Sequence, residues 1–155
     1  MNINKLDVET QAFLQNNGWY PNRDESAPVQ EWESFFANEG FHVSEAARML
    51  LRSLGGLCFH QKGPGLNVSR TGFHFDPTLA AGELDRIQAV ERVAGERLTP
   101  VGEEDEGRLF IAVTESGRLV SLMDDAWVLG DTIEDGITHL VKGIRGTKLD
   151  PPIWL

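Results

Sequence analysis

Three side chains in the middle of the chain have the chemistry to share a metal ion. Cys58 and His60 lie in one segment with strand-like composition, and His74 lies in the next. Thiolates and imidazoles are the usual ligands of zinc, and adjacent strands would bring these groups close together. However, no two histidines are spaced four apart as in zinc-binding helices, and three separately satisfied side chains in or beside a sheet are the favoured explanation. We expect no metal and no other cofactor, and keep a metal protein as an alternative.

The same segment holds the only cysteine of the chain. An intrachain disulfide is therefore impossible. Cys58 stands between Leu57 and Phe59, and a small thiol in such an apolar run is typically buried. We expect Cys58 to be a buried, unreactive side chain.

Motifs for covalent catalysis and for phosphate binding are absent from the sequence. It contains neither Gly-x-Ser-x-Gly nor Gly-x-x-x-x-Gly-Lys-Ser/Thr. Gly55 and Gly56 follow a predicted helix, where the partial charge is negative, so they are expected to end that helix and not to bind an anion. Asp76 precedes Pro77 and is expected to cap the turn that follows. The sequence predicts a protein that is not an enzyme.

Negative charge is the strongest chemical feature of the chain. Its 155 residues include 24 Asp and Glu against 14 Lys and Arg, a formal net charge of −10. This charge repels phosphate backbones and anionic membranes, so we expect neither nucleic acid nor a membrane as partner, and a basic protein is favoured. The four acids of residues 103–106 lack the ligand spacing of a calcium loop. They form either a solvated loop before a strand or part of a protein-binding surface.

The elements that position these residues are predicted from apolar periodicity, caps and turns. Asp7 and Ser44 are expected to cap helices. Helices are predicted over residues 8–16, 27–39, 45–54, 83–94 and 132–142, and strands over 57–61, 66–75, 108–114, 118–123 and 126–129. Short hairpin loops join the later strands, so the sheet should be largely antiparallel with helices packed on one side. We expect one α+β domain over residues 1–155, with a core at about 10–145 and an extended tail at 146–155.

The four tryptophans are candidates for core or interface positions. Trp32 and Trp127 are expected in the core, while Trp19 and Trp154 lie near turns or the end of the sequence and are expected to be partly exposed. An exposed tryptophan beside acids would favour a protein interface. The N-terminal residues have no basic-then-apolar signal pattern, and no apolar run is long enough to span a membrane. The expected location is the cytoplasm.

Several short motifs occur in a fixed order along the chain. Gly18-Trp19-x-Pro21-x-Arg23 stands near the start, and Leu54-Gly55-Gly56-Leu57 ends a helix. Phe75-Asp76-Pro77 with Ala80 follows, and Leu98-x-Pro100-Val101-Gly102-Glu103 precedes Gly117-Arg118, Gly130 and Gly143. In this order the chain resembles the SUKH superfamily, most closely its third branch of bacterial immunity proteins, which is distantly similar to a fungal cell-wall-assembly regulator. Where the family often continues after Gly117-Arg118 with Val-Tyr, this chain has Leu119-Val120.

The resemblance implies an α+β fold, no cofactor, no catalysis and a role in protecting the producing bacterium. Such proteins bind a cognate toxin, often a nuclease or deaminase, and an acidic inhibitor suits the basic cleft of such a toxin. The oligomeric state stays open. A regulatory or scaffold protein of the same fold is the alternative. The residues expected to bind the toxin are Glu103, Glu104, Asp105, Glu106, Asp124, Asp125, Asp131, Glu134 and Asp135, with Trp127 or Trp19 as an apolar anchor.

Overall fold

The computed structural model describes residues 1–151 of the chain. Trp154, which the sequence placed near an exposed end, lies outside the described residues. The helices are α1 (Val8–Asn16), α2 (Ser26–Glu39), α3 (Glu45–Leu54), α4 (Leu84–Ala94) and α5 (Ile133–Lys142), with short 3-10 helices η1 (Ile3–Lys5) and η2 (Pro77–Ala80). The strands are β1 (Cys58–Phe59), β2 (Phe73–His74), β3 (Leu98–Glu104), β4 (Leu109–Thr114), β5 (Leu119–Leu122), β6 (Ala126–Gly130) and β7 (Thr147–Lys148).

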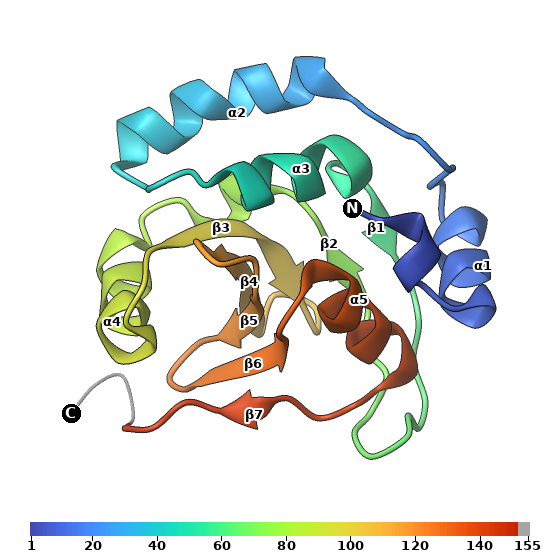
Figure 1. The fold of residues 1–155 in the computed structure, drawn as a ribbon. Helices are drawn as coiled ribbons and strands as arrows, with labels where there is room; N and C mark the ends of the chain where they lie inside the picture. Colours follow the sequence, from blue (N-terminus) through green and yellow to red (C-terminus); the bar gives the residue numbers. More distant parts are fainter. Residues whose placement is uncertain (152–155) are drawn as a thin grey trace.

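The seven strands form one sheet in which each strand pairs with the next along the chain, and every pairing is antiparallel (Figure 1). The predicted α+β class and antiparallel sheet are confirmed. This topology places successive turns at opposite ends of the sheet. The β3–β4 and β5–β6 turns therefore lie at one end, and the β4–β5 turn and the start of α5 lie at the other.

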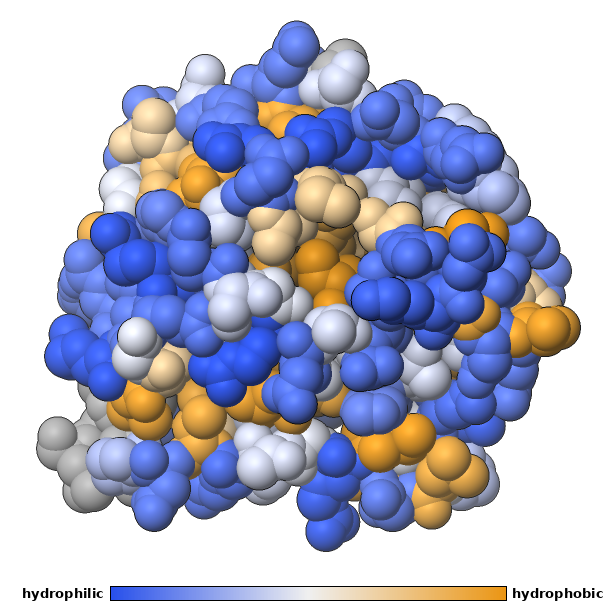
Figure 2. Space-filling view, viewed as in Figure 1, coloured by the Kyte–Doolittle hydropathy of each residue, from blue (hydrophilic) through white to orange (hydrophobic). Residues whose placement is uncertain are grey.

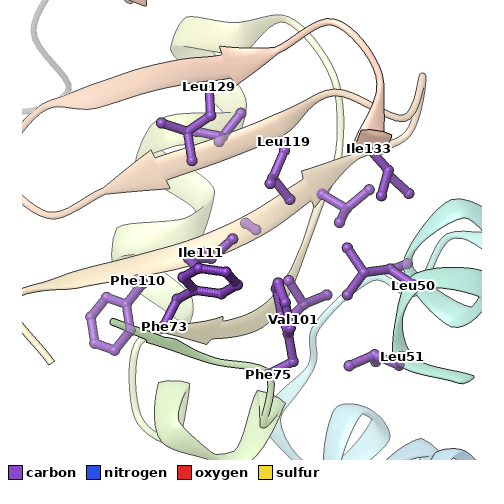
Figure 3. Packing of buried hydrophobic residues seen from close by; sticks show 14 of the residues in the cluster. Leu50, Leu51, Phe73, Phe75, Val101, Phe110, Ile111, Leu119, Leu129 and Ile133 are labelled. Carbon is purple, nitrogen blue, oxygen red and sulfur yellow. The ribbon is translucent and has the colours of Figure 1, made fainter. Parts of the chain in front are cut away.

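Helices cover both faces of the central strands, which corrects the expectation that they pack on one side. All four residues of β5 are buried, although alternate side chains of a strand point to opposite faces. On one face Leu119 packs against Gly136 of α5, where an added Cβ would lie 2.5 Å from the Leu119 side chain. Leu50 of α3 and Ile133 gather near Leu119 (Figure 3). Helix α4 lies across the sheet from α5 (Figure 1).

Strand β3 was not predicted from the sequence, because it contains Pro100 and Gly102, and both residue types disfavour strands. Proline cannot donate to a ladder and is tolerated at a bulge. The register of β3 against β4 shifts between Pro100 and Gly102, as such a bulge requires. Gly102 is needed for close approach, because a Cβ there would meet the carbonyl oxygen of His74 in β2.

The predicted strand over residues 66–75 is largely wrong, since only Phe73–His74 pairs as β2. The preceding segment instead covers the C-terminal end of α5. The backbone N–H of Leu66 donates to the carbonyl of Lys142 at 3.0 Å, and that of Val68 donates to the carbonyl of Gly143 at 3.1 Å. These donors satisfy carbonyls that a helix end leaves free. Because the backbone N–H groups of residues 66–68 hydrogen bond to the end of α5, they do not pair with a neighbouring strand.

The predicted tail also contributes to the sheet. Thr147–Lys148 forms β7, the edge strand that pairs with β6, and the Leu149 N–H donates to the Ala126 carbonyl at 2.8 Å. Residues 147–149 are therefore held against the sheet by backbone hydrogen bonds and are not a free extension.

Candidate protein-binding site

The sheet separates the predicted acidic residues into two groups at its opposite ends. We call the first group the turn-end acids, because they lie in or beside the β3–β4 and β5–β6 turns. The second group, the helix-end acids, lies where β6 leads into α5. The turn-end acids are Glu103, Asp105, Glu106, Asp124 and Asp125, and the helix-end acids are Asp131, Glu134 and Asp135. The predicted acidic residues therefore lie in two separate places on the molecule.

Glu104 differs from its three acidic neighbours, because it is buried. Its residue is 8% exposed, so the expectation of a fully solvated run is wrong at this position. From β3, its carboxylate reaches Ser121 in β5 and Thr71 in the segment before β2. Ser121 Oγ donates to Glu104 Oε1 at 2.6 Å, and Thr71 Oγ1 donates to Oε2 at 3.1 Å. Desolvation by burial raises the pKa of Glu104, although these two hydrogen bonds act in the opposite direction.

A cavity of about 300 Å³ lies beside Glu104 on the face of the sheet covered by α5. Strands β4, β5 and β6, the C-terminal end of α5 and the segment before β2 all line it. Its lining consists of Val68, Ser69, Thr71, Glu104, Asp105, Leu109, Ser121, Trp127, Leu129, His139, Leu140, Gly143, Ile144, Arg145 and Gly146. Most of these contribute apolar atoms, so a carboxylate stands in a largely apolar hollow next to the turn-end acids.

The turn-end acids are partly neutralised by nearby cations. Arg108 Nη1 lies 3.0 Å from an Asp105 oxygen, Lys148 Nζ lies 3.4 Å from Asp125, and Arg86 Nη1 lies 3.4 Å from Asp124. Pairs at such exposed positions contribute little to stability. They do hold the acids in place around the β3–β4 and β5–β6 turns.

The two proposed tryptophan anchors have different surroundings. Trp19 is 4% exposed and its indole N–H donates to Ser53 Oγ at 3.2 Å, so the expectation of a partly exposed anchor is wrong. Trp127 was expected in the core but is only half-buried, because it lines the cavity near the edge strand β7. Lys148 Nζ lies 5.8 Å from its ring centroid. Of the two, only Trp127 is partly exposed and lies near the turn end.

The Gly18-Trp19-x-Pro21-x-Arg23 motif connects the segment after α1 to the C-terminal end of α3 through hydrogen bonds. Arg23 donates to the carbonyl oxygen of Ser53 at 2.8 Å and to that of Gly55 at 3.1 Å. Gly55 is required for close packing, since a Cβ there would lie 2.7 Å from the Trp32 ring. These contacts give the motif a structural role.

The junction around Phe75 is structural as well. Phe75 is fully buried, and its carbonyl accepts a hydrogen bond from Gly56 N–H at 2.7 Å. The predicted cap is confirmed: Asp76 Oδ1 accepts hydrogen bonds from the Thr78 N–H at 2.9 Å and from its hydroxyl at 2.6 Å, and Pro77 begins η2.

The possible metal ligands do not assemble into a site in the part of the chain that the structure describes. Cys58 lies opposite His74 in the β1–β2 ladder, but no group of three or more His, Cys, Asp or Glu among residues 1–151 could hold a metal ion. The Cys58 side chain is exposed, so the prediction of a buried thiol is wrong. Strand β1 is short and lies at the edge of the sheet, which leaves alternate residues open to solvent.

Several residues of the cavity were not identified from the sequence. Ser121 gives the clearest signal, because it interrupts the apolar strand Leu119–Leu122. Thr71 and His139 come from a loop and a helix that only the tertiary structure brings near Glu104. His139 Nδ1 is hydrogen bonded to the Leu129 carbonyl, which fixes the ring at the cavity wall.

Hydrophilic residues cover most of the face shown in Figure 2, and hydrophobic ones appear in small separate groups. The exposed large hydrophobic residues are Val8, Tyr20, Met49, Leu66 and Leu79. Such scattered positions are normal for a protein surface and do not by themselves mark an interface. Among the described residues, no helix is long and apolar enough to cross a membrane.

Comparison with protein-family models agrees with the motifs. No curated protein and no solved structure gives a significant match. The model of the SUKH-3 immunity protein family matches residues 6–143, which include every helix and strand except η1 and β7. The chain therefore belongs to the SUKH-3 immunity protein family.

Proposed function

We propose that this protein neutralises a cognate toxin domain by binding it at the turn end of the sheet, without catalysing a reaction. The family match supports an immunity role. The observation that points to the turn end is the position of a buried carboxylate, Glu104, in an apolar cavity beside the turn-end acids. Apolar surface for an anchor and charge for steering are the two features that a protein-binding surface combines.

The proposed partner is a basic toxin domain that acts on nucleic acid or nucleotides, such as a nuclease or deaminase. A cleft that binds phosphates carries positive charge, and the net charge of −10 on this chain attracts it. The helix-end acids add to this long-range attraction. The apolar cavity lies beside the turn-end acids, so we place the contact at the turn end.

The test is co-expression with the toxin domain encoded by the neighbouring gene. We expect wild-type protein to restore growth and to elute with an inactive toxin variant as one complex on a sizing column. Loss of both results would reject the proposed pairing. A complex that forms without restoring growth would instead support the regulatory or scaffold alternative.

A further inference from the structure

The carboxylate of Glu104 is buried without a cation to balance it. Burial of an ionised carboxylate is unfavourable unless it is paired or fully hydrogen bonded. Among residues 1–151 no salt bridge joins Glu104 to a lysine, arginine or histidine, and the like charge of Asp105 also acts on it. Ser121 and Thr71 each donate one hydrogen bond to it. Because a carboxylate can accept about four, it retains capacity for further donors.

A second feature adds negative potential to the same cavity. Helix α5 ends at Lys142, and His139, Leu140 and Gly143 at this end line the cavity. The C-terminal end of a helix carries a partial negative charge of about half an electron. This helix end adds to the negative potential of Glu104 and favours a cation over an anion, although backbone N–H groups of residues 66–68 already hydrogen bond to its last carbonyls. The rim holds the one arginine of the lining, Arg145, whose residue is exposed while Glu104 is buried.

The size and lining of the cavity restrict the kind of cation. At about 300 Å³, it is at the lower limit of pockets that hold small molecules, which are about 300–1,000 Å³. Leu109, Leu129 and Leu140 provide apolar walls, which suit an aliphatic stem. Trp127 provides an aromatic ring, on which a guanidinium can stack.

We infer that this cavity receives a single arginine side chain of the partner protein, whose guanidinium pairs with the carboxylate of Glu104. This inference rests on the proposed function, because the arginine belongs to the toxin domain. It differs from steering by the turn-end acids, which act at long range on the toxin as a whole. The arginine would supply the donors that the carboxylate still lacks, and its stem would cover the apolar walls.

The test uses a small probe and does not require the toxin. The purified full chain is titrated at pH 7 with n-butylguanidinium and, separately, with the neutral analogue n-butylurea. Binding is followed by the NMR shifts of the Ser121 amide and the Trp127 indole N–H. We expect saturable shifts with butylguanidinium and binding at least about tenfold weaker with butylurea, since hydrogen bonds to a charged group contribute about 1.5–3 kcal/mol.

Two variants complete the experiment. E104Q keeps the shape of the side chain and is expected to weaken butylguanidinium binding at least about tenfold. E31Q removes the same charge from an exposed position on α2, outside the cavity and outside both groups of acids, and is expected to bind like wild type. Equal binding of the two probes, equal binding by E104Q, or no saturable shift would overturn the inference. The probe comparison in wild type stands even if E104Q folds poorly. If only the toxin rescue fails, the proposed function is rejected. The affinity of the cavity for butylguanidinium is still measured independently.

Discussion

Glu104 was predicted from the sequence to be an exposed acidic residue, but in the structure it is buried. The run of four acids predicts a solvated loop, yet the first two are the last residues of a strand. Because alternate residues of a strand face opposite ways, Glu103 and Glu104 have different environments. Composition alone does not distinguish them. The position of the strand end, which the sequence did not reveal, decides which carboxylate is buried.

The burial of Glu104 predicts a specific dependence of stability on pH. Its pKa is raised in the folded protein mainly by desolvation, so the folded state holds the proton more tightly than the unfolded state. The contribution of this residue to stability therefore falls as pH rises from the ordinary value of 4.5 through the raised pKa. We expect E104Q to be more stable than wild type at pH 7, with the difference shrinking toward pH 4. Urea unfolding at both pH values measures it, and a difference that grows on acidification would contradict the account.

Asp7 predicts the opposite dependence on pH. Its side-chain hydrogen bond with Lys142, followed by the bond from the Thr10 N–H, lowers the pKa of Asp7 from 3.8 to about 2. The stabilisation is complete above about pH 4 and is lost as pH falls toward 2. Asp7 is also the cap of α1, as the sequence predicts. We expect D7A to lose about 0.5–2 kcal/mol at pH 7 and D7N, which keeps a capping oxygen, to lose less.

Thermal or urea unfolding of the two Asp7 variants at pH 7 and pH 3 separates the cap from the ion pair. The deficit of D7N should diminish at pH 3, where wild-type Asp7 is closer to its own pKa. A deficit of D7N that equals that of D7A at pH 7 would show that the ion pair, and not the cap, provides the stabilisation.

At the scale of elements, local signals predicted the helices well and the sheet only in part. The caps Asp7 and Ser44 and the glycines after α2 and α5 act locally, and they lie where the sequence placed them. Strand β3 and the segment before β2 depend on distant partners. Pro100 is acceptable only because a bulge is present, and residues 66–68 pair with the end of α5, which follows more than 70 residues later.

Gly102 tests whether the bulge of β3 requires close approach to β2. The G102A substitution would place a Cβ against the carbonyl oxygen of His74, so one of the two strands must shift. We expect a loss of about 1–3 kcal/mol in the free energy of unfolding. The neighbouring E103A variant, at a partly exposed side chain, should change it by no more than about 0.5 kcal/mol. Equal effects of the two variants would show that the close approach is not required.

At the scale of the whole molecule, the antiparallel topology separates the predicted acidic residues into the turn-end acids and the helix-end acids. The sequence predicted the acidic residues as one set, because position along the chain does not show at which end of a sheet a turn lies. The order β3–β4–β5–β6 places the turn-end acids beside the cavity and the helix-end acids at the opposite end. Because the same number of charges can be removed from either end, the effect of position can be separated from the effect of net charge.

The most direct measurement compares toxin association for two matched triple variants across a range of salt concentrations. The turn-end variant is E106Q/D124N/D125N, and the helix-end variant is D131N/E134Q/D135N; each removes three negative charges. We expect the turn-end variant to associate at least about threefold more slowly with the cognate toxin domain and to show a weaker salt dependence, with the helix-end variant closer to wild type. Equal slowing by both variants, or greater slowing by the helix-end variant, would contradict binding at the turn end.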